Sequence, residues 1–141
     1  MFELDSRLAE DTYKVGELPL SLVLLFKDAN YPWTILVPKR AKLREIYELD
    51  HEDRQQLLLE SCSLSRVMTT LYRPEKMNVA ALGNMVPQLH LHHIARFTDD
   101  SAWPGPVWGQ VPALEYDSVS IKRRVNELRE GLLGLNIGFK A

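Results

Sequence analysis

The most informative part of the chain is the stretch Val86-Pro-Gln-Leu-His-Leu-His-His-Ile-Ala-Arg96, which holds three of the four histidines in 141 residues. On a β-strand, alternate side chains share a face. A strand here would therefore carry one polar row, Gln88, His90 and His92, on one face, and Leu89, Leu91 and His93 on the other. Two imidazoles and a carboxamide in one row are poor core material, because each buried polar group needs a partner. The pattern predicts the floor of a site that binds a metal or presents a nucleophilic imidazole to a phosphate.

The same stretch resembles the signature of the histidine triad (HIT) superfamily, His-φ-His-φ-His-φ-φ with φ apolar. It departs at two positions, where Gln88 stands at the first triad position and His93 at an apolar one. The segment Thr34–Arg40 is similar to the family's strand that ends in Pro-Lys, and Trp103–Gly109 resembles the Trp-Pro segment that follows the triad in some members. Asn84 lies shortly before the triad, as a polar amide often does. The resemblance covers roughly residues 1–110 and is to members of bacterial type.

The resemblance implies an α+β fold with an antiparallel sheet and a long helix against it. It also implies a nucleotide hydrolase or transferase that cleaves a phosphoanhydride or phosphoramidate, such as a dinucleoside polyphosphate or a nucleoside phosphoramidate. His90 would attack the α-phosphate and form a covalent nucleotidyl-histidine, since a neutral imidazole is a competent nucleophile at pH 7. His92 would donate a hydrogen bond to a phosphate oxygen or the leaving group. Gln88, which cannot shuttle a proton, would orient His90 or hold a phosphate oxygen.

Four further residues are candidates for binding the nucleotide. Asn84 is expected near a phosphate, and Asp28 near the ribose hydroxyls, although both are also ordinary turn residues. Phe26 is a candidate for lining a base pocket, with core packing as its alternative. Trp103 is expected to cover the site or to pack across a subunit contact.

Two other functions stay open. The chain could be a nucleotide-binding protein with little or no turnover, because Gln88 replaces a histidine. It could also bind a metal through the His-x-His pair His90 and His92, although a third and a fourth ligand would be expected. Cys62 is predicted to be buried and inert within a helix. The favoured interpretation includes no metal and no cofactor.

The composition of the chain limits the number of domains, the kinds of partner and the cellular compartment. The length suits one domain, and a net charge of −2 gives no basic face for nucleic acid. One cysteine excludes an internal disulfide and favours a reducing compartment. The longest apolar run, Leu18–Phe26, is too short to span a membrane, and no signal peptide is visible at the acidic start. We therefore expect a cytoplasmic protein without a membrane partner.

The pattern of apolar residues and breakers predicts the elements. We expect helices over residues 5–14, 50–72 and 117–133, with caps at Asp5 or Ser6, at Asp50, and at Asp117 or Ser118. Gly16 would stop the first helix. Strands are expected over 18–26 and 33–37, as a hairpin, and over 77–82 and 88–97. The HIT-like domain would span 1–110, with 111–141 as a helical extension packed on it.

The resemblance also implies a homodimer. Trp103, Val107 and Trp108 lie in a Pro/Gly loop with no period of its own. A small domain would have difficulty covering that apolar surface, and aromatic residues are enriched at interface centres. We expect the loop to contribute to the dimer interface or to the neighbouring site; the alternative is that it folds back on its own core.

Overall fold

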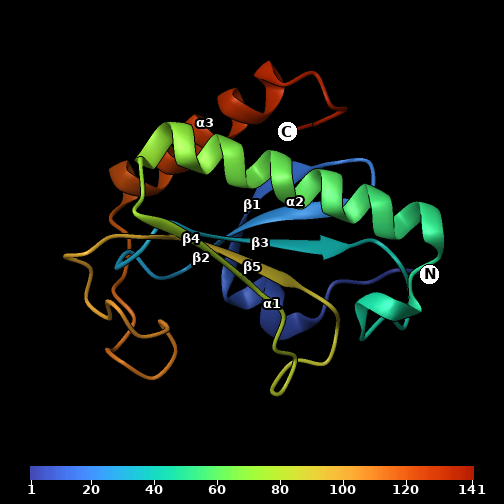
Figure 1. Ribbon diagram of the computed structural model, residues 1–141, viewed down its shortest axis with the longest axis horizontal. Helices are drawn as coiled ribbons and strands as arrows, with labels where there is room; N and C mark the ends of the chain where they lie inside the picture. Colours follow the sequence, from blue (N-terminus) through green and yellow to red (C-terminus); the bar gives the residue numbers. More distant parts are fainter.

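A five-stranded antiparallel sheet, in the order β1-β2-β3-β5-β4, forms the centre of the computed structural model, which describes all 141 residues. The strands are β1 (Thr12–Glu17), β2 (Ser21–Phe26), β3 (Trp33–Pro38), β4 (Lys76–Ala80) and β5 (Leu91–Arg96). The helices are α1 (Ser6–Glu10), α2 (His51–Tyr72) and α3 (Ser118–Gly134), with a short 3-10 helix, η1 (Ile46–Glu48). The long α2 and α3 lie over one face of the sheet, and α1 lies on the other (Figure 1). The predicted α+β fold is confirmed.

The predicted hairpin and both long helices are present. β2 and β3 pair antiparallel, and β3 then pairs with β5. Asp50 caps α2 by accepting a hydrogen bond from the backbone N–H of Asp53 at 2.8 Å. Asp117 caps α3 by accepting one from Ser120 at 2.7 Å. Each carboxylate satisfies a backbone donor that the first turn of a helix leaves unpaired.

The expected boundaries are wrong at the N-terminus and around the histidines. The helix expected over 5–14 ends at Glu10, because residues 12–17 pair with β2 as strand β1. Gly16 therefore lies inside a strand and does not stop a helix. The strand expected over 88–97 begins only at Leu91, since β3 pairs with residues 91–94. The strands expected over 18–26 and 77–82 are shorter or shifted, at 21–26 and 76–80.

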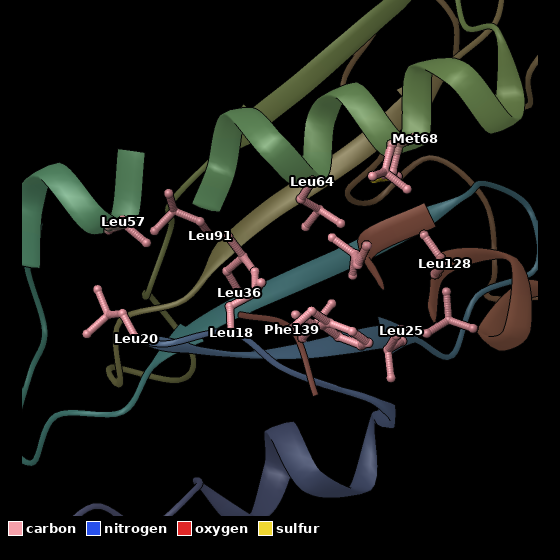
Figure 2. Packing of buried hydrophobic residues seen from close by; sticks show 14 of the residues in the cluster. Leu18, Leu20, Leu25, Leu36, Leu57, Leu64, Met68, Leu91, Leu128 and Phe139 are labelled. Carbon is pink, nitrogen blue, oxygen red and sulfur yellow. The ribbon is translucent and has the colours of Figure 1, made fainter. Parts of the chain in front are cut away.

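Two apolar clusters cover the two faces of the sheet. The larger lies between the sheet and the long helices and includes the fully buried Leu36, Leu64 and Leu128. Figure 2 shows these three side chains in the layer between the helices and the strands. The smaller cluster, on the α1 face, includes Trp33 and Ile35 of β3. Successive residues of β3 thus enter different cores, and both faces of the central strands are buried.

The C-terminal segment joins the sheet at Gly16. Glu17 and Lys140 exchange backbone hydrogen bonds of 2.8 and 2.9 Å, and Phe139 is part of the larger core. A β-carbon at position 16 would overlap the Lys140 carbonyl oxygen and the Phe139 ring. Glycine is therefore required here by the close approach of another part of the chain.

We expect Gly16→Ala to lower the free energy of unfolding by about 1–3 kcal/mol, because the added methyl group pushes the C-terminal segment away from β1. Urea unfolding measured by tryptophan fluorescence checks this. Gly134→Ala is the control, since a β-carbon there meets no atom within 4 Å. An equal loss of stability in the two variants would contradict the role given to Gly16.

Candidate active site

An indole from the neighbouring strand fixes the ring of His92. The Trp33 Nε1–H on β3 donates a hydrogen bond to His92 Nδ1 at 2.9 Å. An indole nitrogen can only donate, so Nδ1 of His92 is unprotonated and the ring proton is on Nε2. This Nε2–H has no hydrogen-bond partner within the protein and is not sealed from solvent. It is therefore free to donate to a bound molecule.

His90, just before β5, has the opposite tautomer. Its Nδ1 lies 2.7 Å from the backbone carbonyl oxygen of Gln88, which can only accept. The ring proton of His90 is therefore on Nδ1, and Nε2 keeps its lone pair. The rings of His90 and His92 meet edge to face with centroids 4.9 Å apart. The site thus offers one unprotonated and one protonated Nε2 on neighbouring rings.

Burial keeps His92 neutral. It lowers the pKa of His92 to about 3, and charge on His90 or His93 acts in the same direction. At neutral pH the ring is therefore a hydrogen-bond donor through Nε2 and carries no positive charge.

The two imidazoles line a cavity of about 240 Å³ on the α1 face of the sheet. Its apolar wall includes Leu8 of α1, Phe26 of β2 and Trp108 from the loop after β5. Its other polar members are Asn84, from the loop before β5, and Asp11, which follows α1. The Asp11 carboxylate makes no hydrogen bond or ion pair within the protein. The cavity thus combines flat apolar surface with a few polar groups, as small-molecule sites do.

Aromatic rings form much of this wall around Trp33. Phe26 stacks on Trp33 with centroids 4.3 Å apart, and Trp108 meets it edge on at 5.6 Å. Trp108 also contacts His92, with centroids 5.0 Å apart. These contacts hold the imidazole among aromatic rings, which supply buried area and preferred edge-to-face geometry.

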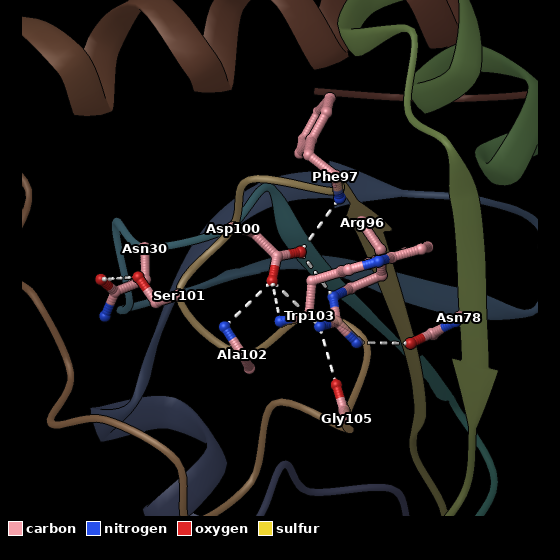
Figure 3. A network of polar contacts seen from close by, with 9 residues as sticks. All are labelled: Asn30, Asn78, Arg96, Phe97, Asp100, Ser101, Ala102, Trp103 and Gly105. Atoms are coloured by element: carbon pink, nitrogen blue, oxygen red, sulfur yellow. Dashed lines mark hydrogen bonds and ion pairs between the residues drawn. The ribbon is translucent and has the colours of Figure 1, made fainter.

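A buried ion pair shapes the loop that carries Trp108. Arg96, at the end of β5, is 1% exposed and donates to Asp100 through Nε at 2.9 Å and Nη2 at 3.1 Å. The same guanidinium donates to Asn78 Oδ1 and to the Gly105 carbonyl oxygen, both at 2.8 Å. Figure 3 shows Arg96 between strand β4 and the loop, joined to both. Sequence reasoning missed this pair, although Arg and Asp four residues apart at a strand end were visible.

Asp100 completes the network from the loop. It accepts hydrogen bonds from the backbone N–H groups of Phe97, Ala102 and Trp103 at 2.7–3.0 Å. Burial alone would raise the pKa of Asp100, but the bonds from Arg96 and the loop N–H groups outweigh it and lower the pKa to about 2. Removing one partner of such a pair costs about 3–5 kcal/mol. The network therefore strongly constrains the path of the loop.

His93 is on the opposite face of β5, against α2. Its Nδ1 donates to the Leu91 carbonyl oxygen at 3.1 Å, and its Nε2 accepts from the Ser61 hydroxyl at 2.7 Å. The ring is completely buried, and burial lowers its pKa to about 4. His93 is therefore a structural histidine whose two ring nitrogens both have hydrogen-bond partners.

Gln88 does not line the cavity, contrary to the expected role beside His90. Its side chain bonds to the N-terminal segment, where Oε1 accepts from the Asp5 N–H at 2.9 Å and Nε2 donates to the Glu3 carbonyl oxygen at 2.8 Å. The residue leaves the expected row because β5 begins after it, so strand alternation does not reach position 88. Only its backbone carbonyl orients His90.

Asp28 and Trp103 also lie outside the lining of the cavity. Asp28 is buried and its Oδ1 accepts hydrogen bonds from the backbone N–H groups of Asn30 and Leu114, so it fixes a turn. Trp103 lies over the Arg96 guanidinium, 5.9 Å from ring centroid to Cζ. Asn84 and Phe26, by contrast, are part of the lining. Sequence reasoning missed Asp11 because the segment around it was assigned to a longer helix.

The Trp loop folds onto its own chain. Val107 is buried in the smaller core, and Trp108 contacts the site.

Cys62 is exposed on α2, which corrects the expected burial. No group of three or more His, Cys, Asp or Glu side chains is arranged to hold a metal ion. With both Nδ1 atoms engaged, His90 and His92 offer only two ligand nitrogens to the metal-binding alternative.

Comparison with known proteins identifies the family. Residues 7–99 match the HIT domain family. The chain belongs to this family. Among solved structures, histidine triad proteins from Bradyrhizobium japonicum and Marinobacter aquaeolei VT8 are 48% and 53% identical to it, each with a TM-score of 0.92. The matches cover 93% and 96% of this chain and 98% of each of theirs.

A histidine triad protein from Sinorhizobium meliloti 1021 is 38% identical, with a TM-score of 0.90 over 93% of this chain and 97% of that one. No curated protein matches the chain. HIT domain proteins bind small nucleotide ligands, and the family includes hydrolases as well as binding proteins. None of the helices is both long and apolar enough to cross a membrane.

We expect the stability of this HIT protein to fall as the pH drops from about 6.5 to about 4. In this range the unfolded chain binds protons at His93 and His92 that the folded protein excludes, because both folded-state pKa values are lowered. The His93 share is about 3 kcal/mol. Urea unfolding from pH 7.5 to 4 measures it.

His93→Gln should flatten this pH dependence, since glutamine accepts the Ser61 hydrogen bond without titrating. His51→Gln, at an exposed position at the start of α2, is the control and should leave the slope unchanged. A slope that is the same in wild type and His93→Gln would show that His93 does not carry the effect.

Proposed function

We propose that this HIT protein is a nucleotide hydrolase or nucleotidyl transferase that acts at the α-phosphate through a covalent nucleotidyl-His90. The observation that carries the proposal is the pair of opposite tautomers on one cavity, with His90 Nε2 unprotonated and His92 Nε2 protonated. The proposed substrates are dinucleoside polyphosphates and nucleoside phosphoramidates, and the route uses no cofactor.

In the first step the lone pair of His90 Nε2 forms a bond to the α-phosphorus. The phosphoanhydride P–O or phosphoramidate P–N bond breaks, and the leaving group departs with the bonding electrons and takes its proton from solvent. The positive charge that develops on the His90 ring is stabilised by its Nδ1–H bond to the Gln88 carbonyl oxygen. The His92 Nε2–H donates to the phosphate, where negative charge increases.

In the second step water attacks the same phosphorus and the bond to His90 breaks. The nucleotide leaves with the oxygen of the water, a proton goes to solvent, and neutral His90 is restored. Splitting one displacement into two is the purpose of covalent catalysis. A transferase would use another nucleophile in place of water.

The remaining cavity groups suit the other parts of a nucleotide. The Asn84 amide can donate to a phosphate oxygen, and the unpartnered Asp11 carboxylate can accept from ribose hydroxyls, the role that was expected of Asp28. The ring of Phe26 and the indole of Trp108 offer apolar surface to a base.

The decisive experiment traps the intermediate. The purified protein is mixed with a dinucleoside polyphosphate or an adenosine phosphoramidate and denatured within milliseconds. Alkaline pH is used because acid hydrolyses a phosphorus–nitrogen bond to histidine. Intact mass should rise by one nucleotidyl group, and peptide mapping should locate it on His90. Binding without any adduct or turnover would favour the alternative of a nucleotide-binding protein.

We expect His90→Ala to reduce turnover at least about a thousandfold, because the nucleophile is lost. His92→Gln should reduce it about a hundredfold or more, because one donor to the phosphate is lost or misplaced. His51→Ala is the control at an exposed position. Retention of most of the wild-type rate by His90→Ala, with the fold intact by circular dichroism, would reject the nucleophile.

We also propose that the protein is a homodimer that pairs through the edge of its sheet. Strand β4 has a neighbour on one side only, and Val79 on it is 49% exposed. An exposed edge strand with an apolar side chain is a template for pairing with a second copy. Closed two-fold pairs are the commonest assembly. The Trp103–Trp108 loop, folded on its own core, is not needed for this interface.

Light scattering should therefore give a dimer mass at micromolar concentration, and Val79→Lys should shift the protein to monomer. Val119→Lys, at an exposed position on α3, is the control and should stay dimeric. A wild-type monomer would reject the dimer, and a dimer that survives Val79→Lys would reject the edge strand as its interface.

A further inference from the structure

The N-terminal segment Phe2–Asp11 forms a wall of the His90 cavity. Leu8 and Asp11 line the cavity directly, and Leu8 is 4% exposed within the smaller core. Phe2 and Leu4 pack on the same core. The helix within this segment has only five residues, which is too short to be stable by itself. The wall therefore depends on contacts with the rest of the protein.

Gln88 supplies a two-point contact to this segment. Its carboxamide accepts from the Asp5 N–H at 2.9 Å and donates to the Glu3 carbonyl oxygen at 2.8 Å, so it pairs with the backbone as a neighbouring strand would. Only an amide side chain presents a donor and an acceptor side by side in this way. The two nitrogens of a histidine ring point away from each other, so they cannot both bond to one stretch of backbone, and an ionised glutamate has no donor.

A second tether lies close to the first. Arg7 Nη1 donates to the Met85 carbonyl oxygen at 2.7 Å, and Met85 is part of the cavity lining. The loop before β5 therefore holds the N-terminal segment at two places. Meanwhile the backbone carbonyl of Gln88 orients His90, two residues away. One residue thus links the position of the wall to the position of the nucleophile.

We propose that Gln88 is a positioning residue that clamps Phe2–Asp11 as the wall of the His90 cavity. This rests on the proposed function in so far as the ligand is a nucleotide. The wall is apolar at Leu8 and anionic at Asp11, so it suits the nucleoside and repels the phosphate. Loss of the clamp should therefore weaken substrate binding and leave the chemical step at His90 nearly unchanged.

The test compares Gln88→Ala and Gln88→Glu with wild type, using the full chain. Glutamate keeps the acceptor for Asp5 but loses the donor to Glu3. In Gln88→Ala, KM should rise about tenfold, as expected from losing ordinary hydrogen bonds. The single-turnover rate constant for nucleotidylation at saturating substrate should stay within about threefold of wild type. Gln88→Glu should also raise KM, because its carboxylate faces the Glu3 carbonyl oxygen without a donor.

A double-mutant cycle tests whether Gln88 acts through the segment. Asp5→Pro removes the backbone N–H that donates a hydrogen bond to Gln88 Oε1. The φ of −54° at this position is compatible with proline. Asp5→Ala is the matched control, because it also loses the cap of α1 but keeps the N–H. If the clamp operates, Gln88→Ala raises KM less in the Asp5→Pro background than in wild type, because one of its two bonds to the segment is already lost.

Two measurements test, without any nucleotide, whether Gln88 holds the N-terminal segment in place. Hydrogen exchange of the Asp5 amide should accelerate about tenfold in Gln88→Ala. Modification of His90 by diethyl pyrocarbonate should also be faster, because a loosened wall exposes Nε2. If the wild type neither binds nor cleaves nucleotides, the proposed function fails while these two results still test the clamp.

Three results would overturn the proposal: unchanged exchange of the Asp5 amide in Gln88→Ala, independent effects of Gln88→Ala and Asp5→Pro that multiply, or a large fall in the single-turnover rate constant with KM retained. The last would show that Gln88 acts on the reacting phosphate.

Discussion

Strand β5 is buried on both faces, and this constraint requires a hydrogen-bond partner for each of its imidazoles. An unpaired buried donor or acceptor costs about 1–3 kcal/mol. Trp33 supplies the partner of His92 on one face, and Ser61 supplies that of His93 on the other. The Trp33 indole can only donate and the Leu91 carbonyl oxygen, bound to His93 Nδ1, can only accept, so the bonds that stabilise the strand also fix the tautomers of His92 and His93. The protonation state of the site is therefore a consequence of the packing of the sheet.

A second constraint acts from the end of the same strand. Arg96 and Asp100 pair in the interior and bind the backbone of the loop that follows, which places Trp108 beside Trp33 and His92. Such an arrangement prepares a site before any ligand arrives, since its groups are already oriented and partly shielded from water. The buried ion pair therefore positions this loop at the cavity through its hydrogen bonds to the loop backbone.

The cavity is completed by parts of the chain that are distant in sequence. Asp11 follows α1, Asn84 precedes β5, and Trp108 follows it. By contrast, Asp28 and Gln88, which motif matching favoured, bind backbone groups elsewhere. A motif gives the residue type at a position, but the hydrogen bonds available to that side chain decide where it points. Gln88 binds the N-terminal backbone because two complementary groups are within its reach.

The sequence by itself determined the α+β architecture, the membership suggested by the triad, the capped helices at Asp50 and Asp117, and the separation of His92 from His93. These follow from local rules, namely apolar periodicity, cap chemistry and the alternation of side chains along a strand. Only the tertiary structure decided that β1 replaces the end of a helix, that Gln88 leaves the row of histidines, and that Asp11 lines the cavity in place of Asp28. These depend on pairing with β2, on where β3 stops pairing with β5, and on contacts between segments more than 80 residues apart, which a local pattern of residues does not encode.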